Sequence, residues 1–172
     1  NLDLDKTEWA QPKVFEGEAD YMRYIDTEDG VSPLLFPPSK ELIKWNSYEH
    51  DESGITTEEP QKIIKMHEKR HKKEKSVIEQ LKHMHVVNIF GNSGPLIMTY
   101  GSTTMSVLEA LKYGDIEARV IQPIYLRPFP NWILSQYMDE EMIIVEQSLQ
   151  GQFSDLIKQK GVLKVKQLIN RY

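Results

Sequence analysis

Residues 95–114, PLIMTYGSTTMSVLEALKYG, decide the fold of this chain. They open with a short apolar run at 96–100, bounded by glycine and proline, which is typical of a buried strand in a parallel sheet. A turn and an amphipathic helix pattern follow, and a second apolar run lies at 118–124. Strand, helix and strand in this order form a βαβ unit, so the sequence predicts an α/β domain.

Both ends of this helix carry recognisable signals. Thr103 or Thr104 is expected to cap its first turn, because a hydroxyl accepts hydrogen bonds from the free N–H groups there. Gly114 is expected to end the helix in a left-handed conformation. The inward face is predicted from apolar residues at helical spacing, which are Met105, Leu108 and Leu111.

The turn before the helix is also a candidate anion site, made by Gly101, Ser102 and Thr103. Backbone N–H groups and the positive end of the helix dipole point toward such a turn. The segment is neither a P-loop nor a dinucleotide-binding glycine motif. The alternative is a well-capped helix, which needs no ligand.

The composition limits the class of protein. The chain has 172 residues, of which 40% are hydrophobic, enough for one domain or for one domain with an arm. It has no cysteine, which excludes disulfides, a thiol nucleophile and a cysteine-held iron–sulfur cluster on this chain. It has neither an apolar run of about 18 residues nor a signal-peptide pattern, so we expect no membrane span and a cytoplasmic location.

Charge is distributed unevenly along the chain, whose formal net charge is −5. Residues 1–60 hold 15 acidic and 5 basic residues, whereas residues 61–85 hold 8 basic and 3 acidic ones. A net acidic chain with one short basic helix is a poor candidate for binding nucleic acid. The basic stretch is expected to be a solvated helix, or to pair with the acidic arm or with a partner.

Three segments are expected. Residues 1–55 contain prolines and glycines but no sustained period, which predicts an extended acidic arm and loop with a turn at 28–30. Residues 56–85 predict a long, charged linking helix, and residues 86–172 predict the α/β domain. A short strand is expected at 42–45. Anchors of the arm are expected at Tyr21, Tyr24, Ile25 and Val31.

The long helix has start signals at Thr57, the expected cap, and at Pro60, near the first turn. Inside it, His67 and His71 form a literal H-E-x-x-H pattern, the spacing with which zinc peptidases hold their metal. Here lysines and an arginine crowd the pattern, and the helix lacks the apolar face that a buried catalytic site requires. We therefore expect a solvated helix face and no metal site.

Further apolar runs complete the α/β domain. Strands are expected at 86–90, 142–145 and 162–169, the first of them antiparallel because a short turn follows it. Helices are expected after Pro130 and at 153–160, the latter stopped by a glycine. The predicted architecture has three layers, with helices on both faces of a mostly parallel five-stranded sheet.

Glu146 and Arg127 are expected near the edge where the parallel strands end. Ligands of such sheets usually bind at this edge, which makes both residues candidates for a site. The alternative, which we favour for Glu146, is a carboxylate that hydrogen-bonds the turn following its strand.

Several motifs in order resemble the C-terminal part of the α subunit of 2-oxoacid:ferredoxin oxidoreductases, over residues 20–172. They are Glu28-Asp29-Gly30-Val31-Ser32-Pro33, Glu49-His50-Asp51-Glu52-Ser53-Gly54, Met66-His67-Glu68-Lys69-Arg70, Tyr100-Gly101-Ser102, Tyr125-Leu126-Arg127-Pro128-Phe129-Pro130, and Val145-Glu146-Gln147 with Gly151-Gln152. Relatives usually have arginine after Ser-Pro, where this chain has Leu34. The resemblance implies the transketolase C-terminal-like α/β fold.

The resemblance also implies a function. These enzymes use thiamine diphosphate to decarboxylate a 2-oxoacid oxidatively to an acyl-CoA, and they reduce ferredoxin. Thiamine diphosphate, magnesium and an iron–sulfur cluster are implied for the full complex, and none is expected on this chain alone. The implied partners are a missing N-terminal catalytic domain, a β subunit, ferredoxin and CoA. We expect no catalytic residue on this chain, which alone is predicted to be inactive.

The resemblance further suggests that the loop holding His50 and Asp51 faces the substrate cleft of the complex. The alternative is a solvated acidic turn before a helix, where carboxylates favour the positive helix end. A different class of function also stays open, namely a free-standing α/β module that binds an anion or a partner protein.

Overall fold

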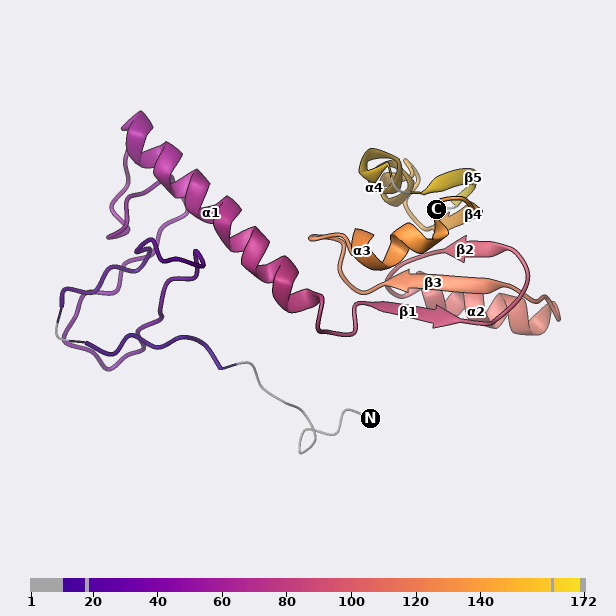
Figure 1. Cartoon of the computed structure of the whole chain (residues 1–172), viewed down its shortest axis with the longest axis horizontal. Coiled ribbons are helices and arrows are strands. Elements are labelled where there is room, and N and C mark those ends of the chain that lie inside the picture. Colours follow the sequence, from indigo (N-terminus) through magenta and orange to yellow (C-terminus); the bar gives the residue numbers. More distant parts are fainter. Residues whose placement is uncertain (1–10, 18, 162, 171–172) are drawn as a thin grey trace. The chain divides into compact units, whose positions relative to one another are not determined.

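The computed structural model describes residues 11–17, 19–161 and 163–170 and divides into two compact units (Figure 1). The first unit ends at Val77, and the second begins at Ile78. The first contains the arm and most of helix α1, Pro60–Leu81, and the second contains the sheet. The three-segment division at residues 55 and 85 stays a prediction.

The second unit is built on a five-stranded sheet with the strand order β1-β3-β2-β4-β5. Its central strands β2, Leu96–Met98, β3, Arg119–Pro123, and β4, Glu141–Glu146, are parallel to one another. The edge strand β5, Lys164–Asn170, is parallel to β4, and the other edge strand β1, Val87–Phe90, is antiparallel to β3. The predicted α/β architecture with a mostly parallel sheet is therefore confirmed.

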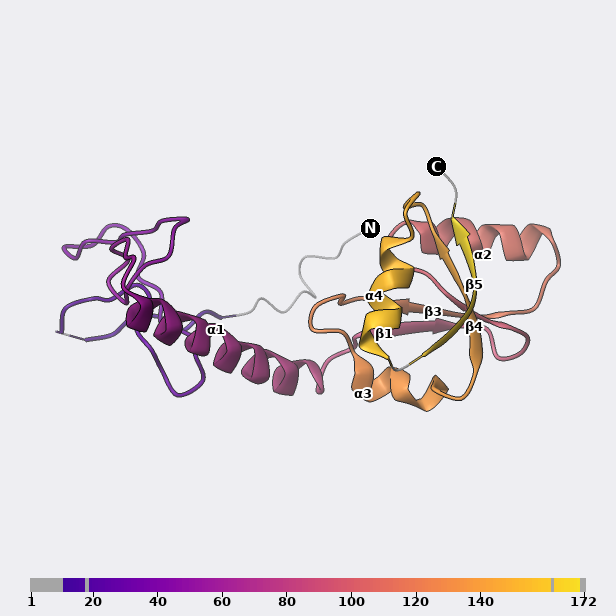
Figure 2. The ribbon, with the colours of Figure 1, turned by 90° about the horizontal axis from the view of Figure 1, so that it is seen from above.

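Helices cover both faces of this sheet (Figure 2). Helix α2, Thr103–Tyr113, connects β2 to β3, while α3, Asn131–Leu134, continued by a 3-10 turn at Ser135–Tyr137, and α4, Gln152–Lys160, follow β3 and β4. The chain crosses from β2 to β3 in one direction and from β3 to β4 in the other. Because such crossovers are right-handed, α2 lies on one face and α3 and α4 lie on the other.

Residues that alternate along the strands form two apolar layers. On the α2 side, Ile97 and Val120 pack with Val107 of the helix. On the opposite side the strands carry side chains that are fully buried, including Met98, Ile121, Met142 and Ile144. Because β2 is buried on both faces, its sequence is a continuous apolar run rather than an alternating pattern.

The details of α2 differ from the prediction. Ser102, not a threonine, occupies the N-cap position and makes no side-chain capping bond, because its backbone is already helical. Gly114 has a φ of −83°, and the left-handed residue is instead Asp115, with a φ of 48°. Of the predicted inward residues, Leu108 and Leu111 pack against the core, whereas Met105 is 68% exposed; Thr104 and Val107 are also buried.

Helix α1 begins at Pro60 itself, where the missing N–H costs no hydrogen bond. The predicted cap Thr57 lies too early: its hydroxyl accepts a bond from the N–H of Glu59, before the helix starts. The predicted strand at 42–45 is wrong, since Leu42 and Trp45 are largely exposed and no strand pairs with them in the described chain. No helix in the described residues is long and apolar enough to cross a bilayer.

Candidate functional site

The turn at residues 28–30 brings the arm directly onto α1. Gly30 donates its N–H to the carbonyl of Thr27 and has a φ of +72°, a conformation that favours glycine. A Cβ at this position would lie 2.7 Å from the backbone N of Lys73 and 2.8 Å from the carbonyl O of Lys69. The backbone of the arm therefore contacts the backbone of the helix, which only glycine permits.

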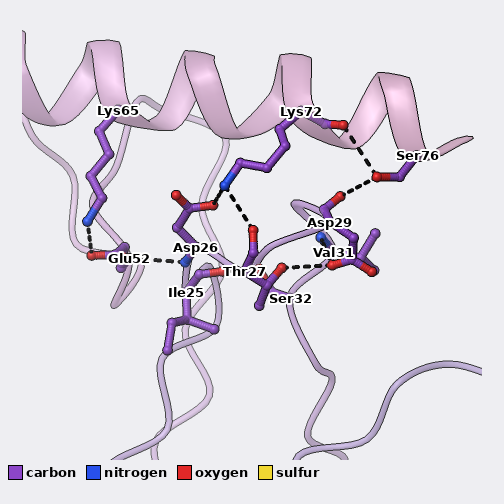
Figure 3. A network of polar contacts seen from close by, with 10 residues as sticks. All are labelled: Ile25, Asp26, Thr27, Asp29, Val31, Ser32, Glu52, Lys65, Lys72 and Ser76. Atoms are coloured by element: carbon purple, nitrogen blue, oxygen red, sulfur yellow. Dashed lines mark hydrogen bonds and ion pairs between the residues drawn. The ribbon is translucent and has the colours of Figure 1, made fainter.

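Carboxylates of the acidic arm pair with basic side chains of α1 (Figure 3). The Nζ of Lys72 lies 2.7 Å from Asp26, and that of Lys65 lies 2.7 Å from Glu52. A third pair joins the guanidinium of Arg70 to both oxygens of Glu49, at 3.0 and 2.7 Å. Of the three alternatives left open for the basic stretch, pairing with the acidic arm is therefore the one that these contacts show.

Hydrogen bonds to the backbone fix the turn along the same helix face. Lys72 also donates to the backbone carbonyl of Thr27, at 2.9 Å. The hydroxyl of Ser76 donates to the backbone carbonyl of Asp29, at 2.8 Å. Within the arm, the hydroxyl of Ser32 donates to the carbonyl of Ile25, at 2.9 Å (Figure 3). Ion pairs and backbone contacts thus place the Glu28–Pro33 motif on α1.

Acid is expected to release the arm from α1. The carboxyls of Asp26, Glu49 and Glu52 have pKa values below their ordinary range, chiefly because each accepts hydrogen bonds from a basic side chain of α1. Such a carboxyl adds stability above its unfolded pKa of about 4, and this stability is lost as the pH falls through the lower folded value. Backbone NMR spectra recorded down to about pH 2 should show residues 20–55 losing their dispersed signals. Signals of these residues that persist to pH 2 would contradict the expectation.

The loop around His50 and Asp51 is held by its own hydrogen bonds. Oδ1 of Asp51 accepts from the N–H and hydroxyl of Ser53, at 3.0 and 2.6 Å, and from the N–H of Ile55, at 3.1 Å. The Ser53 hydroxyl is the main cause that lowers the pKa of Asp51. The His50 ring is buried and stacks on Tyr24, with ring centroids 3.8 Å apart. Asp51 therefore orders the loop, and His50 packs against the arm.

A cavity of about 370 Å³ opens between the arm and α1, within the first unit. Its lining is basic, and within the described chain no carboxylate contributes to it; the charged members are Lys13, Arg23, Lys69, Arg70 and Lys73. His50 lines this cavity, whereas Asp51 lines a different hollow beside Lys62 and Lys65. The structure does not bring the two predicted cleft residues into one cavity.

Glu146, predicted near the carboxyl edge of the sheet, is the cap of α4. Its side chain is buried, and its two oxygens accept hydrogen bonds from the backbone N–H groups of Phe153, at 3.0 Å, and Ser154, at 2.8 Å. The favoured alternative, a carboxylate that bonds the following turn, is confirmed. Arg127 lies exposed in the connection between β3 and α3.

The predicted anion site at Gly101, Ser102 and Thr103 lies in the second unit, at the end of β2. Gly101 has a φ of +57°, and Ser102 is exposed while Thr103 is buried. The hydroxyl of Thr104 is buried and has no hydrogen-bond partner among the described residues. Anion binding at this turn stays a prediction.

Each histidine of the H-E-x-x-H pattern lies near one glutamate, the first in the arm and the second in α1. Nε2 of His67 lies 3.4 Å from Glu49 of the arm, and Nδ1 of His71 lies 4.0 Å from Glu74 of the helix. In the described parts of the chain, no group of three or more possible metal ligands comes together.

Sequence reasoning missed Lys69, the most deeply buried charged residue of α1. Only 9% of this residue is exposed, although it stands in a run of charged residues. Its spacing from its neighbours could have indicated this burial. Met66, Lys69 and Lys73 lie three and four positions apart and therefore share one helix face. Its neighbour Met66, 2% exposed, marks that face as the one covered by the arm.

Comparisons with known proteins agree with this arrangement of motifs. No protein-family model matches the chain. The α subunit of 2-oxoacid:ferredoxin oxidoreductase 1 from Sulfurisphaera tokodaii is 33% identical over 91% of the chain and 26% of the relative. That of 2-oxoacid:ferredoxin oxidoreductase 2 from Aeropyrum pernix is 32% identical over 95% of the chain and 27% of the relative. The chain thus spans about a quarter of the length of the curated relatives it matches.

A solved structure is also similar over most of the chain. It is the 2-oxoglutarate:ferredoxin oxidoreductase from Magnetococcus marinus with 2-oxoglutarate, coenzyme A and succinyl-CoA bound. The identity is 26% and the TM-score is 0.71, over 92% of this chain and 29% of that one. These relatives define a class, the ferredoxin-linked oxidoreductases. More particularly, this chain is homologous to one region of the α subunits of 2-oxoacid:ferredoxin oxidoreductases, which confirms the resemblance drawn from its motifs.

Proposed function

We propose that this chain is part of a 2-oxoacid:ferredoxin oxidoreductase. In the proposed reaction the 2-oxoacid loses carbon dioxide, its acyl group passes to the thiol of CoA, and the electron pair passes to ferredoxin. The observation that carries the proposal is the identity of 32–33% to α subunits over 91–95% of the chain. The chain would supply the interface domain and the arm, while a further catalytic domain and a β subunit would complete the complex in the cytoplasm.

The cofactors implied for such a complex would be bound mainly by those other parts. This chain lacks cysteine, so its donors do not fit an iron–sulfur cluster. Its described residues do not gather three or more metal ligands either, which disfavours a magnesium site built from them alone. Thiamine diphosphate would supply the means of stabilising the carbanion left by decarboxylation.

The test is a ferredoxin- or viologen-reduction assay on two preparations. One is the purified 172-residue chain, and the other is the complex that a tagged form of the chain draws from its native host. With CoA, thiamine diphosphate and a panel of 2-oxoacids, we expect turnover by the complex and none by the chain alone. Turnover by the chain alone would refute the assignment as a non-catalytic part, and a complex without 2-oxoacid oxidation would refute the family activity.

We further propose that the 49–54 loop adjusts the substrate cleft of this complex, with His50 as the contacting side chain and Asp51 holding the loop. In the same assay, His50→Phe keeps a ring for stacking on Tyr24, and His71→Phe is the exposed control on α1. A change of about 1–2 kcal/mol in discrimination would alter the ratio of kcat/KM between two 2-oxoacids roughly five- to thirtyfold. Equal preference in both variants and the parent would mean that the loop only leads into α1.

A further inference from the structure

The side chain of Lys69 is largely buried, and it has no counterion among the described residues. Only 9% of the residue is exposed, and its ammonium has no hydrogen bond or ion pair to any other residue of the described chain. Burial lowers its pKa, and the neighbouring charges of Lys73, Arg23 and Arg70 lower it further. A lysine whose side chain is largely buried and lacks a carboxylate partner is costly, which makes its surroundings a candidate site for an anion.

The nearby acidic groups are already committed to other cations. Asp26, whose charge acts favourably on Lys69, is bonded to Lys72 at 2.7 Å. Glu49 is bonded through both oxygens to Arg70. Neither Asp26 nor Glu49 therefore neutralises the charge of Lys69.

Two more cations face the same cavity without a carboxylate partner in the described chain. They are Lys73 and Arg23, both among the lining residues. The Nε of Arg23 is buried and has no hydrogen-bond partner among the described residues, while its guanidinium carbon lies 5.0 Å from the centroid of the Tyr24 ring. With Lys69, three positive charges thus converge on one space.

That space has the size of a small-molecule site. Its volume is about 370 Å³, within the range of roughly 300–1,000 Å³ of ligand pockets. Tyr24 and the buried His50 supply an aromatic part of the wall, and Ser32 and Gly30 supply the arm side. All of these residues belong to the first unit.

We propose that this cavity binds the phosphate or diphosphate group of a small molecule, held by Lys69, Lys73 and Arg23. A single carboxylate would neutralise only one of the three cations. A phosphate or diphosphate carries more negative charge and several acceptor oxygens, which suits two ammonium groups and one guanidinium. The site is independent of the oxidoreductase assignment, since it follows from the charges and the cavity alone. Inorganic diphosphate and a phosphate ester share this chemistry.

Calorimetric titration of the full chain in low salt tests the proposal with inorganic diphosphate, adenosine 5′-diphosphate and acetate. We expect at least one of the two diphosphates to bind at least tenfold more tightly than acetate. Tighter binding of adenosine 5′-diphosphate would identify an ester as the occupant, and equal binding would identify the inorganic ion. Failure of both diphosphates to bind, or acetate binding as tightly as they do, would overturn the proposal.

Matched variants locate the binding. Lys69→Met keeps the apolar stem and should weaken diphosphate binding at least tenfold, and Lys73→Met, at an exposed position, should weaken it at least threefold. Lys75→Met, also exposed on α1 but outside the cavity, is the control and should leave the affinity unchanged. Thermal unfolding with and without diphosphate shows that each variant is folded. Equal affinities in Lys73→Met and Lys75→Met would overturn the assignment even if Lys69→Met failed to fold.

Discussion

Gly30→Ala should detach the arm from α1 while leaving the sheet of the second unit folded. The left-handed backbone conformation alone costs an alanine about 1–2 kcal/mol. The added methyl group would also meet backbone atoms of Lys69 and Lys73 at 2.8 and 2.7 Å, and neither can move without displacing the helix. We expect a total loss on the order of 4 kcal/mol, which is in the range of severe substitutions.

Amide hydrogen exchange measured residue by residue is the appropriate readout for Gly30→Ala. Protection should fall across residues 20–76 and stay unchanged in β2, β3 and β4. Gly101→Ala is the matched control, because Gly101 also has a positive φ, +57°, but no atom lies within 4 Å of the position of its Cβ. The control should show only the cost of the backbone conformation. If both variants lose the same stability and the arm keeps its protection, the close approach of Gly30 to α1 is unimportant.

The sheet could be predicted from the sequence because its signals are local. The apolar run of β2 and the glycine after α4 can be recognised from the local sequence alone. Gly161 indeed ends that helix with a φ of +64°. A strand at 162–169 is also predicted, and β5 lies at the edge of the sheet beside β4. The strand that pairs with β1 could not be predicted. The short turn after β1 suggests pairing with the next strand, β2, whereas β1 pairs with β3.

The arm could not be predicted in the same way, because its contacts are non-local. Residues 42–45 are apolar enough for a strand, yet a strand forms only where another strand offers hydrogen bonds. Lys69 stands among charged residues, and the sequence does not show that it is buried whereas Lys75 is exposed. Pairing of the acidic arm with the basic helix was one of the alternatives that the sequence left open, and the positions that line a cavity could not be predicted.

Glu146 shows how a site candidate at a sheet edge is distinguished from a structural carboxylate. A free ligand-binding carboxylate at the end of β4 would keep an oxygen available, but both oxygens of Glu146 are bonded to N–H groups at the start of α4. The helix dipole adds to this interaction, since the first turn of a helix favours negative charge. The residue is 2% exposed, so water cannot replace the lost bonds in a variant. Its expected contribution is therefore to stability.

Glu146→Ala should lower the free energy of unfolding of the second unit by about 3 kcal/mol, because bonds to charged groups contribute roughly 1.5–3 kcal/mol and the buried N–H groups would be left unpaired. Glu146→Gln should lose less, since its amide oxygen still accepts one of the two bonds. The control is Glu141→Ala on the same strand, whose carboxylate makes an exposed pair with Lys166. Exposed pairs contribute roughly 0–1 kcal/mol, so this variant should unfold at nearly the parent's urea midpoint. A Glu146→Ala midpoint equal to that of Glu141→Ala would show that the capping bonds do not stabilise α4, and Glu146 would again be a candidate for ligand binding.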